Sequence, residues 1–82
     1  MVGEYVAEDG LKITVSRAGS QLTARLRFPG RDNSFPLYAA SETEFFMKTV
    51  DARLIIPADT QGAVERLTFR IGGENRPVKR AR

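Results

Sequence analysis

The sequence TEFFMKTVDARLII, residues 43–56, holds the densest apolar material in this 82-residue chain. Phe45 and Met47 alternate with Phe46, and the same period of two resumes after the break at residues 50–51. A period of two indicates β-strands, and aromatic and β-branched side chains suit a pleated, half-buried surface. The stretch therefore predicts a hairpin at the centre of a small all-β domain.

A single helix is the alternative for this stretch. Ser41 and Glu44 have the Ser-x-x-Glu spacing of a capping box, which opens helices. No residue that breaks a helix follows before Pro57. We favour the hairpin, because the segments on both sides of the stretch also read as strands.

Apolar residues alternate with polar ones in short runs along the whole chain, and these runs predict about eight strands. The residues predicted to point inward are Tyr5, Leu11, Ile13, Val15, Leu22, Leu26, Phe28, Phe35, Leu37, Phe45, Met47, Leu54, Ile56, Leu67, Phe69, Ile71 and Val78. Their combined bulk predicts a packed core and not a roomy ligand cup.

Turn residues separate the runs and predict how the strands connect. Short reversals are expected at residues 8–10, 18–20, 59–62 and 72–75, and a longer polar loop at residues 29–33. Pro36 indicates a sheet edge or a bulge, and residues 81–82 are expected to be frayed. Because parallel crossovers need a dozen or more residues, the fold class expected is an antiparallel up-and-down meander closed into a small barrel or half-barrel.

Composition limits the chemistry that this chain can perform. Residues 1–82 make one domain, and the chain contains neither cysteine nor histidine. A disulfide, a thiolate nucleophile, the commonest general base and the commonest metal ligand are therefore missing. We expect no catalytic residue, no metal site and no cofactor. No apolar run is long enough to span a bilayer.

Arginine supplies most of the formal net charge of +3, and such a charge permits contact with an anionic partner. Four arginines share the outward register of two predicted strands and would form one basic patch if those strands are neighbours: Arg25, Arg27, Arg66 and Arg70. Nucleic acid is not the expected partner, because most aromatic residues point inward and cannot serve as stacking platforms. Tyr38 and Phe46 are the exceptions.

Phe46 and Ile55 lie on the face opposite the inward rows of their strands. If both are exposed, they form an apolar patch suited to docking on another domain. The alternative is that a loop or a chain end covers them.

Three groups of residues together resemble a known family: Gly3-Glu4-Tyr5, then Ser41 to Met47 with Val50-Asp51-Ala52, and finally Val64 to Ile71 with Gly73 and Arg76-Pro77-Val78-Lys79-Arg80. This order resembles the β-domain at the C-terminus of bacterial serine β-lactamase-like hydrolases and related peptidases. The resemblance implies a lipocalin-like meander without an active site of its own, since no position matches the family's catalytic serine and lysine. The turn at residues 72–75 departs from the family pattern and leaves the register of the last strand open.

The resemblance also implies a function. The chain would be a fragment of a longer one, acting as a non-catalytic accessory domain that packs against a hydrolase domain of the same parent chain. Parents of this kind are commonly exported, which implies an extracytoplasmic location. The alternative is a small binding module, either for an apolar ligand inside the barrel or for an anionic polymer on the arginine-rich face.

Overall fold

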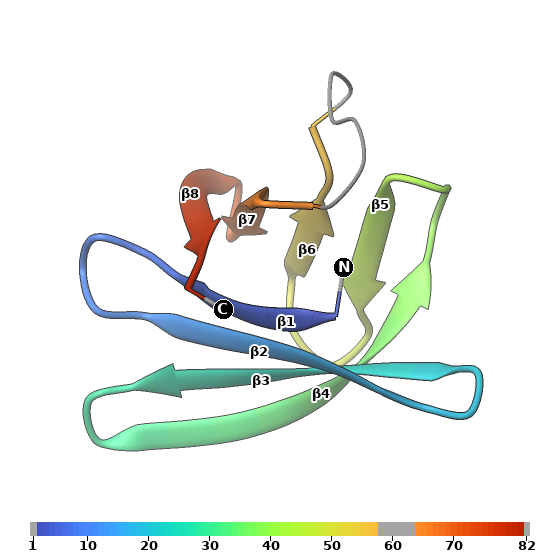
Figure 1. Cartoon of the computed structure of the whole chain (residues 1–82), viewed down its shortest axis with the longest axis horizontal. Coiled ribbons are helices and arrows are strands. Elements are labelled where there is room, and N and C mark those ends of the chain that lie inside the picture. Colours follow the sequence, from blue (N-terminus) through green and yellow to red (C-terminus); the bar gives the residue numbers. More distant parts are fainter. Residues whose placement is uncertain (1, 58–63, 82) are drawn as a thin grey trace.

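Eight antiparallel strands close into one barrel in the computed structural model, which describes residues 2–57 and 64–81 (Figure 1). The strands are β1 (Gly3–Val6), β2 (Lys12–Ala18), β3 (Gln21–Phe28), β4 (Arg31–Ala39), β5 (Glu44–Met47), β6 (Ala52–Ile55), β7 (Arg66–Ile71) and β8 (Glu74–Arg80). Each strand pairs with the next in the sequence, and β8 pairs with β1. The prediction of an all-β meander closed into a small barrel is confirmed.

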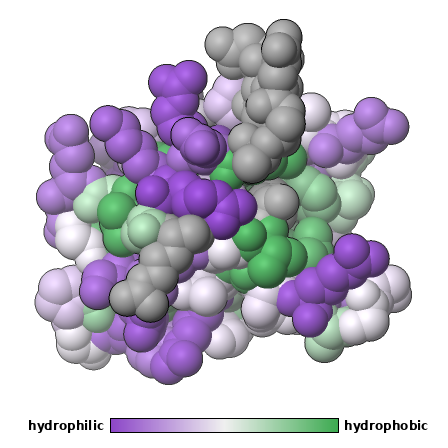
Figure 2. Space-filling model, viewed as in Figure 1, coloured by the Kyte–Doolittle hydropathy of each residue, from purple (hydrophilic) through white to green (hydrophobic). Residues whose placement is uncertain are grey.

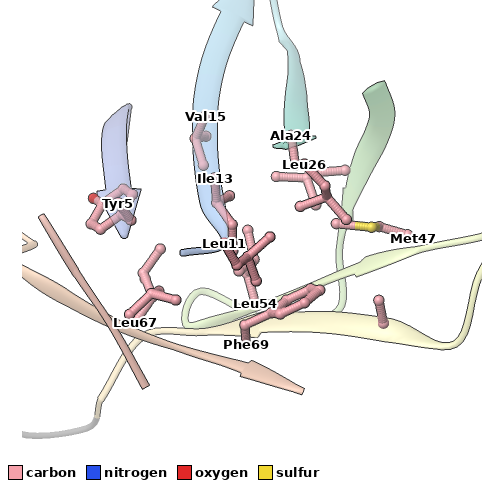
Figure 3. Packing of buried hydrophobic residues seen from close by; sticks show 13 residues of the cluster. Tyr5, Leu11, Ile13, Val15, Ala24, Leu26, Met47, Leu54, Leu67 and Phe69 are labelled. Carbon is pink, nitrogen blue, oxygen red and sulfur yellow. The ribbon is translucent and has the colours of Figure 1, made fainter. Parts of the chain in front are cut away.

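The interior of the barrel is filled with apolar side chains from all eight strands (Figure 3). The buried residues are Tyr5, Leu11, Ile13, Val15, Ala24, Leu26, Leu37, Met47, Ala52, Leu54, Leu67, Phe69 and Val78. Every residue of the predicted inward set either belongs to this cluster or packs against it. Period-two alternation therefore identified the core correctly, because successive side chains of a strand point to opposite faces of the sheet.

The central hairpin consists of β5 and β6, which pair Phe45 with Leu54 and Met47 with Ala52. The alternative of a single helix is therefore wrong. Ser41, the first residue of the Ser-x-x-Glu spacing, lies in a turn and not at a helix start. Its hydroxyl accepts a hydrogen bond from the backbone N–H of Thr43 at 3.2 Å. A serine oxygen can satisfy a nearby backbone donor in a turn as well as at a helix start.

The prediction of a longer loop at residues 29–33 is wrong. Phe28 pairs directly with Arg31, so the connection between β3 and β4 contains only Pro29 and Gly30. Proline at the first position and glycine with φ of +81° at the second are typical of a type II turn. Residues 31–34 are all exposed, so this part of β4 carries no apolar alternation from which a strand could be predicted.

The placement of Glu74 and Asn75 in a turn is also wrong. Ile71 pairs with Glu74, so the connection between β7 and β8 contains only Gly72 and Gly73. Their φ values of +57° and +82° are both positive, as a type I′ hairpin turn requires. The register of the last strand, which the sequence left open, follows from this short turn.

Pro36 lies in the part of β4 that pairs with β3 only. Its register partner is Thr23 on β3, whereas β4 pairs with β5 only at Tyr38 and Ala39. This part of β4 is locally an edge, although the barrel as a whole is closed. A residue without a backbone N–H is tolerated there because one side of the strand needs no ladder hydrogen bond.

The C-terminal end of the described chain lies beside β1 (Figure 1). The backbone N–H of Ala81 donates a hydrogen bond to the carbonyl oxygen of Glu4 at 2.7 Å. The expectation of fraying is therefore wrong for Ala81, because the barrel closure holds its backbone against β1. Residue 82 and the turn expected at residues 59–62 lie outside the described residues.

Candidate functional site

Phe46 and Ile55 both lie on the outer face of the central hairpin and are half-buried. Phe46 is opposite Arg53 in the register, and Ile55 is opposite Glu44. The two apolar residues are therefore diagonal neighbours, two positions apart along the strands, a separation that aromatic side chains can still bridge. The structure brings this predicted pair to one surface.

A second aromatic residue adjoins Phe46 on the same surface. Tyr38 of β4 is its direct cross-strand partner, and the ring centroids lie 5.8 Å apart with an angle of 37° between the ring planes. Aromatic pairs in such tilted arrangements are worth about 0.5–1.5 kcal/mol beyond their area burial. The outward register of both residues could be read from the sequence, but their pairing across the turn at residues 40–43 could not.

Two cations lie over these rings. The Lys48 Nζ is 4.2 Å from the centroid of the Tyr38 ring, and the Arg53 Cζ is 6.0 Å from the centroid of the Phe46 ring. The Arg53 Nη1 also donates to the Glu44 Oε2 at 2.8 Å. We call Tyr38, Phe46, Lys48, Arg53 and Ile55 the aromatic face. It combines apolar area, ring faces and positive charge on one side of the barrel.

The four arginines predicted as one basic patch lie on strands that are not neighbours. Arg25 and Arg27 lie on β3, whereas Arg66 and Arg70 lie on β7, and three strands separate β3 from β7 in either direction around the barrel. Arg66 is opposite Lys79 of β8, and Arg70 is opposite Arg53 of β6. The condition for a single patch of these four residues is therefore not met.

Carboxylates accompany the two arginines of β3. Arg25 forms a two-pronged ion pair with Asp32, in which its Nε donates to the Oδ1 at 2.8 Å and its Nη2 donates to the Oδ2. The hydrogen bond and the charge of Asp32 raise the pKa of Arg25, and the hydrogen bond from Arg25 holds the pKa of Asp32 below its ordinary value. Arg27 lies 3.6 Å from the Glu4 carboxylate. Both ion pairs reduce the positive charge that β3 presents.

The inner surface of the barrel is occupied by the core side chains and therefore offers an apolar ligand little room (Figure 3). Tyr5, Leu54 and Phe69 are each 0 % exposed. Figure 2 shows hydrophobic residues at the surface right of the centre of the face drawn, with hydrophilic residues to the left and lower right of them. The charged and aromatic side chains that could contact a partner, such as those of the aromatic face, lie on the outside of the barrel.

The chain has few side chains that could catalyse a reaction or bind a metal ion. Within residues 2–57 and 64–81, no group of three or more carboxylates could hold a metal ion, and the chain has no histidine or cysteine to join one. The serines have no histidine as a general base. In the same part of the chain, no helix is long and apolar enough to cross a membrane.

Comparison with known proteins found no matching family model, no matching curated protein and no matching solved structure.

Proposed function

We propose that this chain is a non-catalytic accessory domain that packs through the aromatic face against a serine-hydrolase (β-lactamase-like) or peptidase domain of the same parent chain. The observation that carries the docking proposal is the contact between Tyr38 and Phe46 on the outer face of the barrel. The partner class rests on the family resemblance of the sequence.

The composition of the aromatic face supports a protein partner. Tyrosine, phenylalanine and arginine are enriched at protein interfaces, and tyrosine and arginine are enriched among the residues that dominate binding energy. Tyr38 and Phe46 are already half-buried and held by their mutual contact, so docking would cost them little conformational freedom. Lys48 and Arg53 lie on this face, and Arg53 is paired with Glu44. The two cations and one carboxylate leave a net positive charge, which fits a partner surface that carries carboxylates.

Hydrogen exchange can test the docking. We expect backbone amides of residues 44–48 and 52–55 to exchange more slowly in the parent chain than in the isolated 82 residues, because the partner domain would exclude water from this hairpin. Amides of β2 serve as the internal control, since β2 lies away from the central hairpin. Equal exchange at the hairpin in both proteins would refute the proposal.

Substitutions sharpen this test. Phe46→Ala should loosen the docking and restore fast exchange in the parent chain, whereas Thr23→Ala on the outer face of β3 should leave the protection intact. The genomic reading frame gives a second, independent check of the partner class. A complete frame that encodes no hydrolase or peptidase domain beside these residues would exclude the partner named here.

A further inference from the structure

A row of cations runs across five neighbouring strands on the outside of the barrel. Val6 of β1 pairs with Lys12 on one side and with Lys79 on the other. Lys12 pairs in turn with Arg27 of β3, and Lys79 pairs with Arg66 of β7. We call Arg66, Lys79, Lys12 and Arg27 the basic row; Val6 lies at its centre. The row joins one arginine of β3 to one of β7 through the three strands between them.

The row contains two cross-strand pairs of like charge, Lys12 with Arg27 and Arg66 with Lys79. Like charges directly opposite each other destabilise a sheet, so the fold itself gains nothing from this arrangement. Among the ion pairs of residues 2–57 and 64–81, only Arg27 of the row takes part, through Glu4 at 3.6 Å. An anionic ligand would relieve the repulsion in both pairs.

Each end of the row opens into a hollow that contains a further arginine. At one end a hollow of about 370 Å³ is lined by Glu65, Arg66, Lys79, Arg80 and Ala81. At the other end a hollow of about 350 Å³ is lined by Arg27, Phe28, Gly30, Arg31 and Asp32. Cations therefore follow one another from one hollow to the other, with Val6 between Lys12 and Lys79. Each hollow also contains one carboxylate, Glu65 or Asp32.

The shape of the row selects the kind of anion. Neighbouring strands lie about 4.8 Å apart, so four steps between strands give a line roughly 19 Å long. The line follows the convex outside of a closed barrel. A flexible linear polyanion can follow such a curve, whereas a flat bilayer would contact only part of it and a stiff duplex could not bend around it.

We propose that the basic row binds the phosphate backbone of single-stranded nucleic acid without preference for base. The aromatic residues that argued against nucleic acid in the sequence are needed for base stacking, whereas phosphate contacts need only cations. This proposal concerns a surface separate from the aromatic face and does not depend on the docking function.

Fluorescence anisotropy of a labelled single strand of twelve deoxythymidine nucleotides tests the proposal. We expect binding at low salt that weakens as sodium chloride is raised from 20 to 200 mM. For single strands the logarithm of the binding constant falls by about 0.7 per neutralised phosphate for each unit of log salt concentration. Four contacts therefore predict a slope of about −3. No binding at 20 mM salt would overturn the proposal.

A pair of matched double variants separates the row from net charge. Lys12→Gln with Lys79→Gln removes two charges from the row and should weaken binding at least tenfold and reduce the slope by about 1.4, the value for two lost contacts. Lys48→Gln with Arg53→Gln removes two charges from the aromatic face and should change binding less than twofold. Equal losses in both variants would show a net-charge effect and overturn the proposal.

Two further measurements complete the experiment. Both double variants should retain the circular dichroism spectrum of the unsubstituted chain, since all four side chains lie on the outer face. If the row variant does not fold, Lys79→Gln alone replaces it, with Lys48→Gln as its control. Tighter binding to vesicles containing phosphatidylserine, or to a twelve-base-pair duplex, than to the single strand would overturn the choice of ligand.

Discussion

Arg80 lies over the ring of Tyr5, with its Cζ 5.4 Å from the ring centroid. The Tyr5 hydroxyl donates to the carbonyl oxygen of Val64 at 3.2 Å, and the Arg80 Nε donates to the same oxygen at 2.9 Å. The Arg80 Nη2 also reaches the carbonyl oxygen of Val2 at 3.0 Å. These contacts join β1, β8 and the segment before β7. They add to the two register pairs between β1 and β8, Tyr5 with Arg80 and Val6 with Lys79.

The stability of the barrel should fall at alkaline pH because of Tyr5. Burial raises the pKa of Tyr5 above its ordinary value of 10.0, and the charge of Arg80 lowers it in part. The unfolded chain therefore loses this proton at a lower pH than the folded chain does. The unfolding free energy contributed by this group should be constant below about pH 10 and should fall as the pH rises through the folded pKa.

Urea unfolding at pH 8, 9, 10 and 11 measures this loss. The Tyr5→Phe variant should show a shallower decline above pH 10, because phenylalanine has no proton to lose. Lys48→Gln, a substitution on the aromatic face and not at Tyr5, serves as a control and should keep the same decline as the unsubstituted chain. Identical declines for the unsubstituted chain and Tyr5→Phe would contradict the assignment of the alkaline loss of stability to Tyr5.

The ion pair between Arg25 and Asp32 should be visible in a carboxyl titration. The hydrogen bond from Arg25 is the largest cause of the lowered pKa of Asp32, and the charges of Arg25 and Arg27 act in the same direction. Because the folded pKa is depressed, the pair's contribution to stability is present above the ordinary value of 3.8 and is lost as the pH falls through the folded pKa. Carbon NMR of the Asp32 carboxyl should give a titration midpoint below pH 3.8 in the unsubstituted chain. The midpoint should return toward 3.8 in Arg25→Gln. A midpoint that does not move would show that Arg25 is not the cause.

Truncation of core residues should destabilise the barrel strongly. Leu26→Ala or Phe69→Ala should lower the unfolding free energy by about 2–5 kcal/mol, since each removes buried side-chain atoms and leaves a cavity. Thr68→Ala on the outer register of β7 should stay within about 0.5 kcal/mol. The urea midpoint reports the difference, and an unchanged midpoint in either core variant would refute the inward assignment.

The turn between β3 and β4 offers a test of backbone conformation alone. Gly30 has φ of +81°, and a Cβ atom placed there meets no atom within 4 Å. Gly30→Ala should therefore destabilise the chain by about 1–2 kcal/mol through the left-handed conformation and not through a clash. Gly30→Asn should cost less, because asparagine visits this conformation more readily. Thermal unfolding of the two variants distinguishes them, and equal melting temperatures would argue against this turn geometry.

Local alternation sufficed for predicting the strands and the inward rows because side-chain direction in a strand depends only on neighbours in the sequence. It failed at residues 31–34, whose side chains are exposed in β4 and carry no apolar pattern. It failed at Glu74 and Asn75 because a polar residue at a strand end resembles a turn. At both places, strand pairing decided the conformation and side-chain burial did not.

Alternation along the chain is enough to predict the strands, the side chains that fill the core, and the outer face that Phe46 and Ile55 share. Which outward residues meet depends on how the strands pair. The contact between Tyr38 and Phe46 depends on the register across a turn. The basic row depends on the closure of β1 on β8, which places Val6 beside Lys79. Register and closure are long-range properties, because they are set by backbone hydrogen bonds between strands that can lie far apart in the chain.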